Sequence, residues 1–330
     1  MTKFIIIITV FFLSIAINAQ ERDSIFKSQA EKELKAEFPS FRMFNIEYNH
    51  VGKTDFKSEL FGEEFQKGEL KNQKTVNVGF NMPVYKKKKL TVTTSLIYKF
   101  NELEFDNLEN VATIPSFNQN NLITFHNFST AVSATYFSSL FKKPIIYNTS
   151  IIADGNQEGF ERVKAMVGFS FIMKRTAQTT ITLGAIAFVD PTSQIPFFPT
   201  FTYNYKFKND TWDLDFIMPQ RLLLRKYINK NSRLSIGSTL GSNGFYVNID
   251  NPNFPAVAEY SQLDINTGLI YEYRINDNFI TTLKGGMSSF ISSRLTEKAQ
   301  PNKDYFYKNE QDNRGYFNVG ISYNPSPKKK

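Results

Sequence analysis

Apolar and polar side chains alternate along most of this chain, with the period of two that is typical of a β-strand. The clearest run places Val163, Val167 and Met173 on one face, whereas Arg162 and Lys164 fall on the other. A register shift of one residue would bring both cations to the apolar face, at a cost of roughly 2–4 kcal/mol each in membrane hydrocarbon. The sequence therefore determines the register of this strand well.

About fourteen such runs follow one another, and turn-forming residues separate them. The run at Leu222 is weak, and two weak runs that merge would reduce the count to twelve. The closing run has the alternating aromatic character of the last strand of a barrel. The runs are Phe44–Tyr48, Val76–Phe80, Val92–Phe100, Phe128–Tyr136, Ile145–Ile151, Val163–Met173, Leu183–Ala187, Phe201–Phe207, Trp212–Met218, Leu222–Ile228, Leu234–Leu240, Leu263–Tyr273, Phe279–Phe290 and Phe317–Tyr323.

The links between the runs alternate between short turns and long polar segments. Successive links of an antiparallel sheet fall on opposite rims, so the sequence predicts short periplasmic turns and long outer loops, with both termini in the periplasm. It thus predicts an all-β fold, a transmembrane antiparallel up-and-down β-barrel of about fourteen strands. The short links are Lys86–Lys89, Lys142–Pro144, Arg175–Gln178, Lys208–Asp210, Asn229–Ser232 and Asn276–Asn278; the long ones are His50–Gln73, Asn101–Asn121, Asn243–Glu259 and Ser292–Arg314.

The composition agrees with a barrel wall. The mean hydropathy of −0.33 is low, which a barrel tolerates because only alternate residues of its strands face lipid. Aromatic residues make up 15% of the chain, with 33 Phe and 16 Tyr, and rings of such residues are expected at the membrane rims. The chain has no Cys, so it offers neither a disulfide framework nor a lipoprotein anchor.

The first residues predict export. Lys3, the apolar stretch that follows it and the small residue Ala19 are typical of a signal peptide over residues 1–19. An N-terminal membrane helix fits less well, because a spanning helix needs ~20 apolar residues. Residues 20–40 are expected to form a periplasmic segment or short helix, with Ser28 and Glu31 at capping-box spacing, at the rim or folded into the lumen as a plug. The barrel is expected over residues 41–324 and a basic tail over 325–330.

Several segments resemble outer-membrane β-barrel families of unknown function in Bacteroidota. The likeness rests on Ile17-Asn18-Ala19-Gln20 and on the stretch that holds Tyr203–Phe207, Trp212, Met218-Pro219, Arg225-Lys226-Tyr227 and Gly237. It covers most of the mature chain and implies location and fold rather than activity. The barrel-assembly machinery and outer-membrane lipid, including lipopolysaccharide, are the expected partners. Since a basic tail follows Tyr323, an assembly signal is expected to end at that residue rather than at the C-terminus.

Charged residues on the polar faces of the runs are the candidate functional residues. They carry both signs on widely separated strands, so they either line a water-filled pore for small polar solutes or pair across a narrow interior. Strong ion selectivity is not expected. A structural network without a role in transport is the plain alternative. These lumen-facing candidates are Glu47, Lys99, Arg162, Lys164, Asp213, Asp215, Arg233, Asp264, Glu272 and Lys284.

An outer-membrane enzyme that modifies lipid is a competing class. His50 and His126 are the two histidines, and both fall near the expected outer ends of their strands. Ser129 and Ser133 are at odd offsets from His126, so they lie on the opposite face of the strand; Asp154 remains as a partner from a neighbouring strand. The chain shows no nucleophile elbow, phosphate loop or dinucleotide motif. We therefore expect no enzyme, no cofactor and no metal.

A surface receptor or adhesin that acts through its long loops is the other alternative. Aromatic residues in these loops could contact a partner, but packing over the barrel mouth is the favoured interpretation; they are Phe56, Phe61, Phe65, Phe117, Phe254, Tyr305 and Tyr307. The net charge of +8 comes from lysines in turns and tail, so no nucleic-acid partner is expected. The sequence favours a porin-like channel in the outer membrane, with a structural barrel or receptor as the alternative.

Overall fold

The computed structural model describes residues 38–39, 41–110, 121–208 and 211–325. Within these residues, no helix is long and apolar enough to cross a membrane. The elements are β1 (Phe44–Val51), β2 (Thr54–Leu60), β3 (Glu63–Lys87), β4 (Leu90–Asn110), β5 (Leu122–Leu140), β6 (Lys143–Asn156), β7 (Gly159–Arg175), β8 (Thr179–Val189), β9 (Phe197–Lys206), β10 (Trp212–Met218), β11 (Arg221–Asn229), β12 (Ser232–Asn248), β13 (Val257–Arg274), β14 (Phe279–Glu297), η1 (Asn302–Asp304), β15 (Tyr305–Gln311) and β16 (Arg314–Tyr323).

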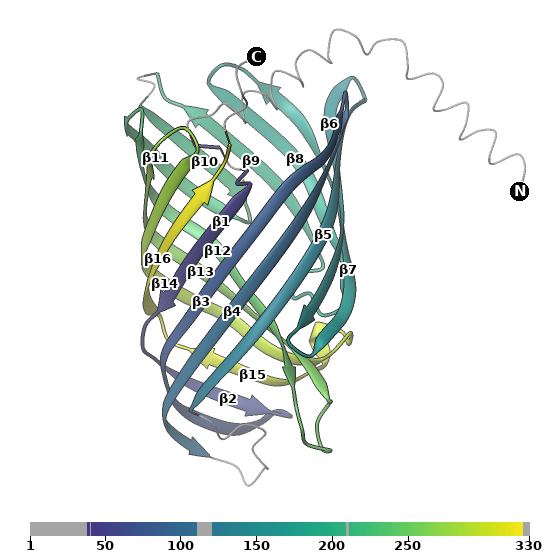
Figure 1. Cartoon of the computed structure of the whole chain (residues 1–330), viewed down its shortest axis with the longest axis vertical. Coiled ribbons are helices and arrows are strands. Elements are labelled where there is room, and N and C mark those ends of the chain that lie inside the picture. The colour runs from purple at the N-terminus through teal and green to yellow at the C-terminus, as the bar shows by residue number, and fades with distance from the viewer. Residues whose placement is uncertain (1–37, 40, 111–120, 209–210, 326–330) are drawn as a thin grey trace, which may run out of the picture.

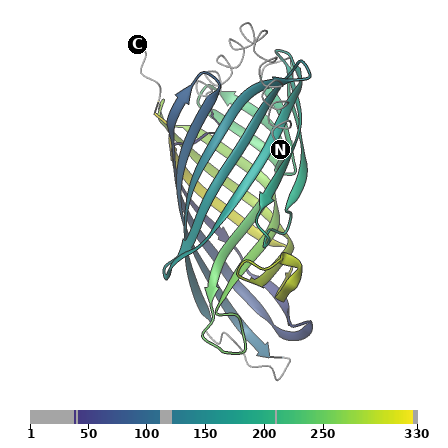
Figure 2. The same ribbon diagram turned by 90° about the vertical axis from the view of Figure 1, so that its right-hand side faces the viewer.

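Fourteen of the sixteen strands close into one antiparallel ring. Neighbours in sequence pair from β3 to β14; β16 pairs with β14 and β1, and β1 pairs with β3 to complete the circle. The strands run at a steep tilt around a single axis (Figures 1 and 2). The predicted fold class and the count of about fourteen strands are therefore confirmed.

The remaining two strands extend the wall at one end. β2 pairs with β3 and β15, and β15 also pairs with β14. Val51 lies opposite Tyr316 and Phe56 lies opposite Gln311, so one register continues across the break between the two pairs. β1 and β2 are thus two halves of an interrupted strand, as are β15 and β16.

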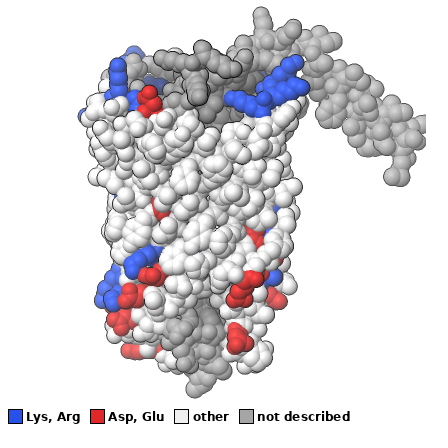
Figure 3. Space-filling model, in the orientation of Figure 1, with Lys and Arg blue, Asp and Glu red and all other residues white. Residues whose placement is uncertain are grey.

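The two faces of the wall differ as the sequence alternation predicts. On β7 the outward side chains of Val163 and Val167 are 59% and 47% exposed, whereas Arg162 is buried on the inner side. Large apolar side chains are exposed on β4, β5, β6, β7, β8, β12, β13 and β14. Figure 3 shows a broad belt without charge between the two charged ends of the barrel. Such an exposed apolar belt would be unfavourable in water and is suited to lipid.

The end of the barrel where β1 begins and β16 ends is called the terminal end here, and the opposite end is the far end (Figure 1). The six short links predicted for the periplasmic rim all connect strands whose described ends meet at the terminal end. The prediction that every far-end link is long is wrong, because β6 and β7 are joined by Gln157–Glu158 and β10 and β11 by Pro219–Gln220. Much of each predicted long loop is also strand: β3 begins at Glu63 and β4 continues to Asn110.

The signal peptide and the helix expected before Phe38 lie outside the described residues. Phe38 and Arg42, just before β1, reach the inside of the barrel at the terminal end. The guanidinium carbon of Arg233 on β12 lies 4.8 Å from the ring centroid of Phe38, and Arg42 forms an ion pair of 3.0 Å with Glu272 of β13. The chain therefore enters β1 from a segment that contacts the lumen.

Candidate functional site

The far half of the lumen is crossed by β12. In the ring of fourteen, β12 and β5 stand seven strands apart in either direction, so they are diametrically opposite. Asn127 of β5 nevertheless donates a hydrogen bond of 3.2 Å to the carbonyl oxygen of Gly244 in β12, and Asn156 of β6 donates one of 3.0 Å to Asn248. Contacts between β12 and the opposite side of the ring therefore span the lumen at this level.

The length of the neighbouring strands explains why β12 turns inward. β10 and β11 are short, and the last pair between β11 and β12 joins Arg221 to Thr239. Beyond Leu240, β12 keeps its β13 partner but has no partner on the β11 side. Gly241 and Gly244 lie in this part of the strand, and glycine within a strand commonly marks a bend or a close approach of two backbones.

Both faces of the inserted hairpin are covered. The successive residues Phe245 and Tyr246 are 4% and 3% exposed, although successive side chains of a strand point in opposite directions. Phe245 stacks on Phe125 of β5 with ring centroids 4.1 Å apart. It belongs to an apolar core that fills the far end of the barrel, formed by Phe56, Leu60, Phe65, Leu70, Leu103, Phe245, Ile249, Phe254, Ala258, Tyr260, Leu295 and Phe306.

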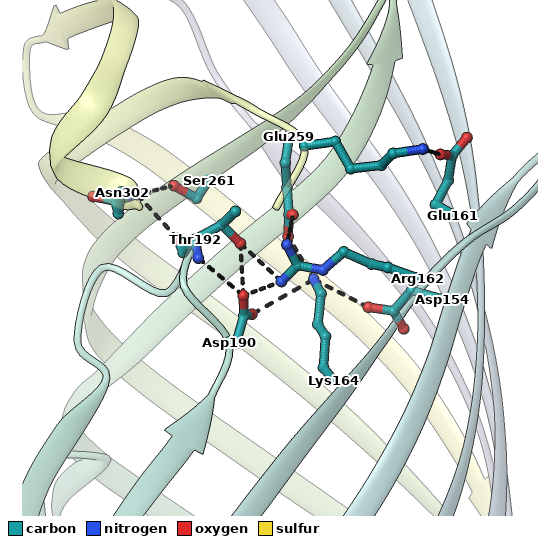
Figure 4. Close-up of polar contacts among 10 residues, drawn as sticks. Asp154, Glu161, Arg162, Lys164, Asp190, Thr192, Glu259, Ser261 and Asn302 are labelled. Carbon is teal, nitrogen blue, oxygen red and sulfur yellow. Dashed lines mark hydrogen bonds and ion pairs between the residues drawn. The ribbon is translucent and has the colours of Figure 1, made fainter. Parts of the chain in front are cut away.

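The opposite face of the hairpin meets a network of charges (Figure 4). Glu259 of β13 accepts a hydrogen bond of 2.5 Å from Lys164 and lies 3.2 Å from Arg162. Lys164 also forms an ion pair of 3.1 Å with Asp154, and Arg162 pairs with Asp190. Two cations and three carboxylates from β6, β7, β8–β9 and β13 therefore converge, and the sheltered site strengthens each interaction.

Three further contacts lie between the network and the far rim of the barrel. Thr192, in the loop between β8 and β9, accepts a hydrogen bond of 3.1 Å from Arg162 through its hydroxyl, and its carbonyl accepts one of 3.0 Å from Asn302 of η1. Lys298 pairs with Glu161 at 2.8 Å. Figure 4 shows Thr192 and Asn302 on one side of Arg162 and Glu161 on the other. The hairpin is thus held on its polar face by ion pairs and on its apolar face by ring stacking.

A second polar cluster lies at the terminal end of the lumen. Glu272 accepts a hydrogen bond of 2.7 Å from Nε of Arg233 and also binds Arg42. Asp215 lies between Arg221 and Arg225, both of which donate to it. Arginine suits such sites because its planar guanidinium can donate to several acceptors at once.

Each of the remaining predicted residues also lies among polar groups. Glu47 pairs with Lys284 at 3.2 Å, and Lys99 donates a hydrogen bond of 3.3 Å to Asn243 of the inserted hairpin. Asp264 accepts one of 2.7 Å from Gln262, and Asp213 is buried. The ten residues therefore do not form one site: Arg162 lies with Lys164, Arg233 with Glu272 and Glu47 with Lys284, at three separate places in the lumen. A role in solute passage stays a prediction for all of them.

The sequence does not predict several of the residues that form contacts inside the barrel. Asp190 and Glu259 complete the charge network, but both fall in or beside segments that the alternation assigns to links. Arg225 and Arg314 are likewise buried or partly buried and bound inside the barrel. The glycines at 241 and 244 are the one local signal of an inward bend, and they do not say which opposite strand is reached.

The histidines are not assembled with a carboxylate. His126 exchanges a hydrogen bond of 2.9 Å with the hydroxyl of Tyr98, and His50 packs on Phe317 with centroids 5.1 Å apart. Asp154, the partner left open by the sequence, binds Lys164 inside the lumen instead. Among the residues that the structure describes, no group of three or more His, Cys, Asp or Glu could hold a metal ion.

The ring, its apolar belt and its polar interior define a β-barrel of the outer-membrane type. The chain matches the family described as Domain of unknown function (DUF6268) over residues 24–324, and it belongs to that family. A comparison with curated proteins finds no match.

Several solved structures show a low similarity to this chain. They include an outer membrane channel from Pseudomonas putida F1, with 9% identity, a TM-score of 0.38 and coverage of 87% of this chain and 96% of that one. A FadL homologue from Pseudomonas aeruginosa has 8% identity, a TM-score of 0.35 and coverage of 87% and 91%. The outer membrane protease OmpT from Escherichia coli has 7% identity, a TM-score of 0.28 and coverage of 85% and 96%.

Proposed function

We propose that this protein spans the outer membrane and is a channel for small polar solutes, whose far mouth is closed by the β12–β13 hairpin in this structure. The observation that carries the proposal is the contact of Asn127 and Asn156 with opposite strand β12. A barrel of fourteen strands is wide enough for a passage unless something fills it. Here part of the wall itself fills it.

The chemistry of the lumen supports polar rather than apolar solutes. Charged groups lie along the lumen from Arg42 and Glu272 at the terminal end to Arg162 and Glu259 near the far end. Such groups offer hydrogen bonds to water and to polar solutes, and their mixed signs favour neither cations nor anions strongly.

The contacts that hold the hairpin across the lumen can be broken. The hairpin's hydrogen bonds to opposite strands involve the amides of Asn127, Asn156 and Asn243, and each such neutral bond contributes only about 0.5–1.5 kcal/mol. The ion pairs at Glu259 would exchange for water when the hairpin withdraws. An opening of the far mouth therefore needs no change in the pairing of β1 to β11.

The experiment is conductance of the purified, folded protein in planar bilayers, compared with a variant that lacks the hairpin tip. Gly244 and Ser261 are register partners, so an Asn-Gly turn can join them in place of residues 245–260. We expect steady conductance steps from the shortened variant and rare openings from the native chain. A shortened variant that is folded, as judged by heat-dependent gel mobility, but silent would overturn the channel.

A further inference from the structure

The lysines at the two ends of the barrel differ in whether they pair with carboxylates. At the far end, lysines are paired with carboxylates: Lys67 with Glu109 at 2.9 Å, Lys71 with Glu104 at 2.7 Å and Lys308 with Glu59 at 2.8 Å. The hydrogen bonds from Lys71 and then Asn72 hold the pKa of the Glu104 carboxyl below its ordinary value. The positive charge of this end is therefore largely neutralised by the protein itself.

The terminal end carries a ring of cations instead, which we call the basic rim. All six turns of this end contribute, and within the described residues of these turns Asp277 is the one carboxylate. The ion pairs among described residues do not involve Lys87, Lys143, Lys174 or Lys226. Figure 3 shows cations at this end of the visible face. The basic rim consists of Lys86, Lys87, Lys88, Lys89, Lys142, Lys143, Lys174, Arg175, Lys206, Lys208, Lys226, Lys230 and Arg274.

Exposed aromatic residues lie next to the basic rim on the same strands. Tyr85, Tyr136, Tyr147 and Tyr273 are all at least one-third exposed, which is the position of an aromatic belt at a membrane–water interface. The belt fixes the depth of the barrel. The cations just beyond it then stand at the level of lipid headgroups.

Lys226 shows the arrangement in detail. It lies on the outer face of β11, in register with Trp212 of β10, and its ammonium is 5.2 Å from the centroid of that indole. A lysine on a lipid-facing wall directs its charge to the interface. The indole N–H of Trp212 is a second hydrogen-bond donor beside this ammonium. The ammonium can therefore bind the phosphate of a lipid in the adjoining leaflet.

We infer that the basic rim binds anionic phospholipid headgroups of the leaflet at the terminal end, an inference that rests on the membrane-spanning part of the proposed function. The argument is charge complementarity: Lys87, Lys143, Lys174 and Lys226, which form no ion pair among the described residues, face the layer in which phosphate is concentrated. The far end has few unpaired cations to offer to the phosphates of lipopolysaccharide.

The experiment measures which lipid stays with the protein. Nanodiscs are formed from equal parts of phosphatidylcholine and phosphatidylglycerol with the same acyl chains, and lipid bound after extraction is quantified by mass spectrometry. The rim variant replaces Lys87, Lys143, Lys174 and Lys226 with Gln. The control replaces Lys53, Lys67, Lys71 and Lys308 of the far end with Gln, so both variants lose the same charge.

We expect the native protein and the control to retain about five-fold more phosphatidylglycerol than phosphatidylcholine. This is the factor by which one lysine near an anionic surface strengthens binding. The rim variant should lose the preference, and salt should weaken it in the native protein because the charges are at the surface. Equal preference in both variants would overturn the inference. Binding to purified peptidoglycan that depends on the rim, without lipid preference, would also overturn it and assign the rim to the cell wall.

The outcomes distinguish a failure of this inference from a failure of the proposed function. A protein that does not insert into bilayers at all contradicts the membrane-spanning barrel. A protein that inserts and shows heat-dependent gel mobility, yet retains both lipids equally, leaves the barrel intact and contradicts the lipid site alone.

Discussion

Phe125 and Phe245 stack with their ring centroids 4.1 Å apart and an interplanar angle of 15°, although they belong to strands on opposite sides of the ring. This contact spans the lumen. In the proposed channel, the two rings would have to part to widen the passage at this level.

Separating the rings should both weaken the closure and lower stability. Phe245→Ala removes a buried ring and should reduce the free energy of unfolding by about 3 kcal/mol, with longer open periods in bilayer recordings. A double-mutant cycle with Phe125→Ala should give a coupling energy of roughly 0.5–1.5 kcal/mol. Additive losses in urea unfolding would mean that the two rings do not stabilise each other.

A crosslink across the lumen should hold the mouth closed. Asn156 and Asn248 are joined by a hydrogen bond of 3.0 Å, and the native chain has no Cys, so Asn156→Cys with Asn248→Cys introduces the only thiols. Oxidation should abolish conductance and a reductant should restore it.

The matched control pairs neighbouring wall strands. Ser133 of β5 and Ser150 of β6 lie with their hydroxyl oxygens 2.8 Å apart. A disulfide from Ser133→Cys and Ser150→Cys constrains the same barrel without crossing it, so its conductance should not respond to reductant. If both disulfides change conductance alike, the hairpin is not the element that moves.

Glu259 should be essential to the polar side of the closure. Glu259→Gln removes the bridging carboxylate of the hairpin and leaves Arg162 and Lys164 with Asp190. Losing hydrogen bonds between charged groups costs roughly 1.5–3 kcal/mol. The exposed pair of Lys67 and Glu109 provides the comparison, since Glu109→Gln should cost about 0–1 kcal/mol. Equal midpoints for the two variants in urea unfolding would show that the network contributes nothing.

The membrane-facing wall was predictable because a physical constraint acts on every second residue. In β7, lipid on one side and polar lumen on the other enforce alternation from Val163 to Met173, and the structure shows the outward residues Val163 and Met173 as exposed. The far-end extensions were not predictable in this way. Around Lys67 and Lys71 of β3, both side chains pair with carboxylates of β4. The β3–β4 register also shifts twice between Lys67 and Asn72, so no period of two marks the strand.

The candidate site was predictable only in its parts. Alternation places Arg162 and Lys164 on the inner face of β7, because the outer face must be apolar. It cannot supply Glu259, whose approach depends on β12 and β13 bending across the lumen beyond Arg221, the far-end residue of β11. That bend follows from the lengths of neighbouring strands, which is a property of the assembled sheet rather than of any one segment.

The most direct test of the account is the environment of single labels along β7 in reconstituted bilayers. Spin labels at Val167 and Phe169 should collide with oxygen dissolved in lipid and be shielded from a water-soluble nickel reagent, whereas a label at Ser170 should show the reverse. Water contact at Val167 and Phe169 together with lipid contact at Ser170 would contradict the barrel wall on which the channel and the lipid site both depend.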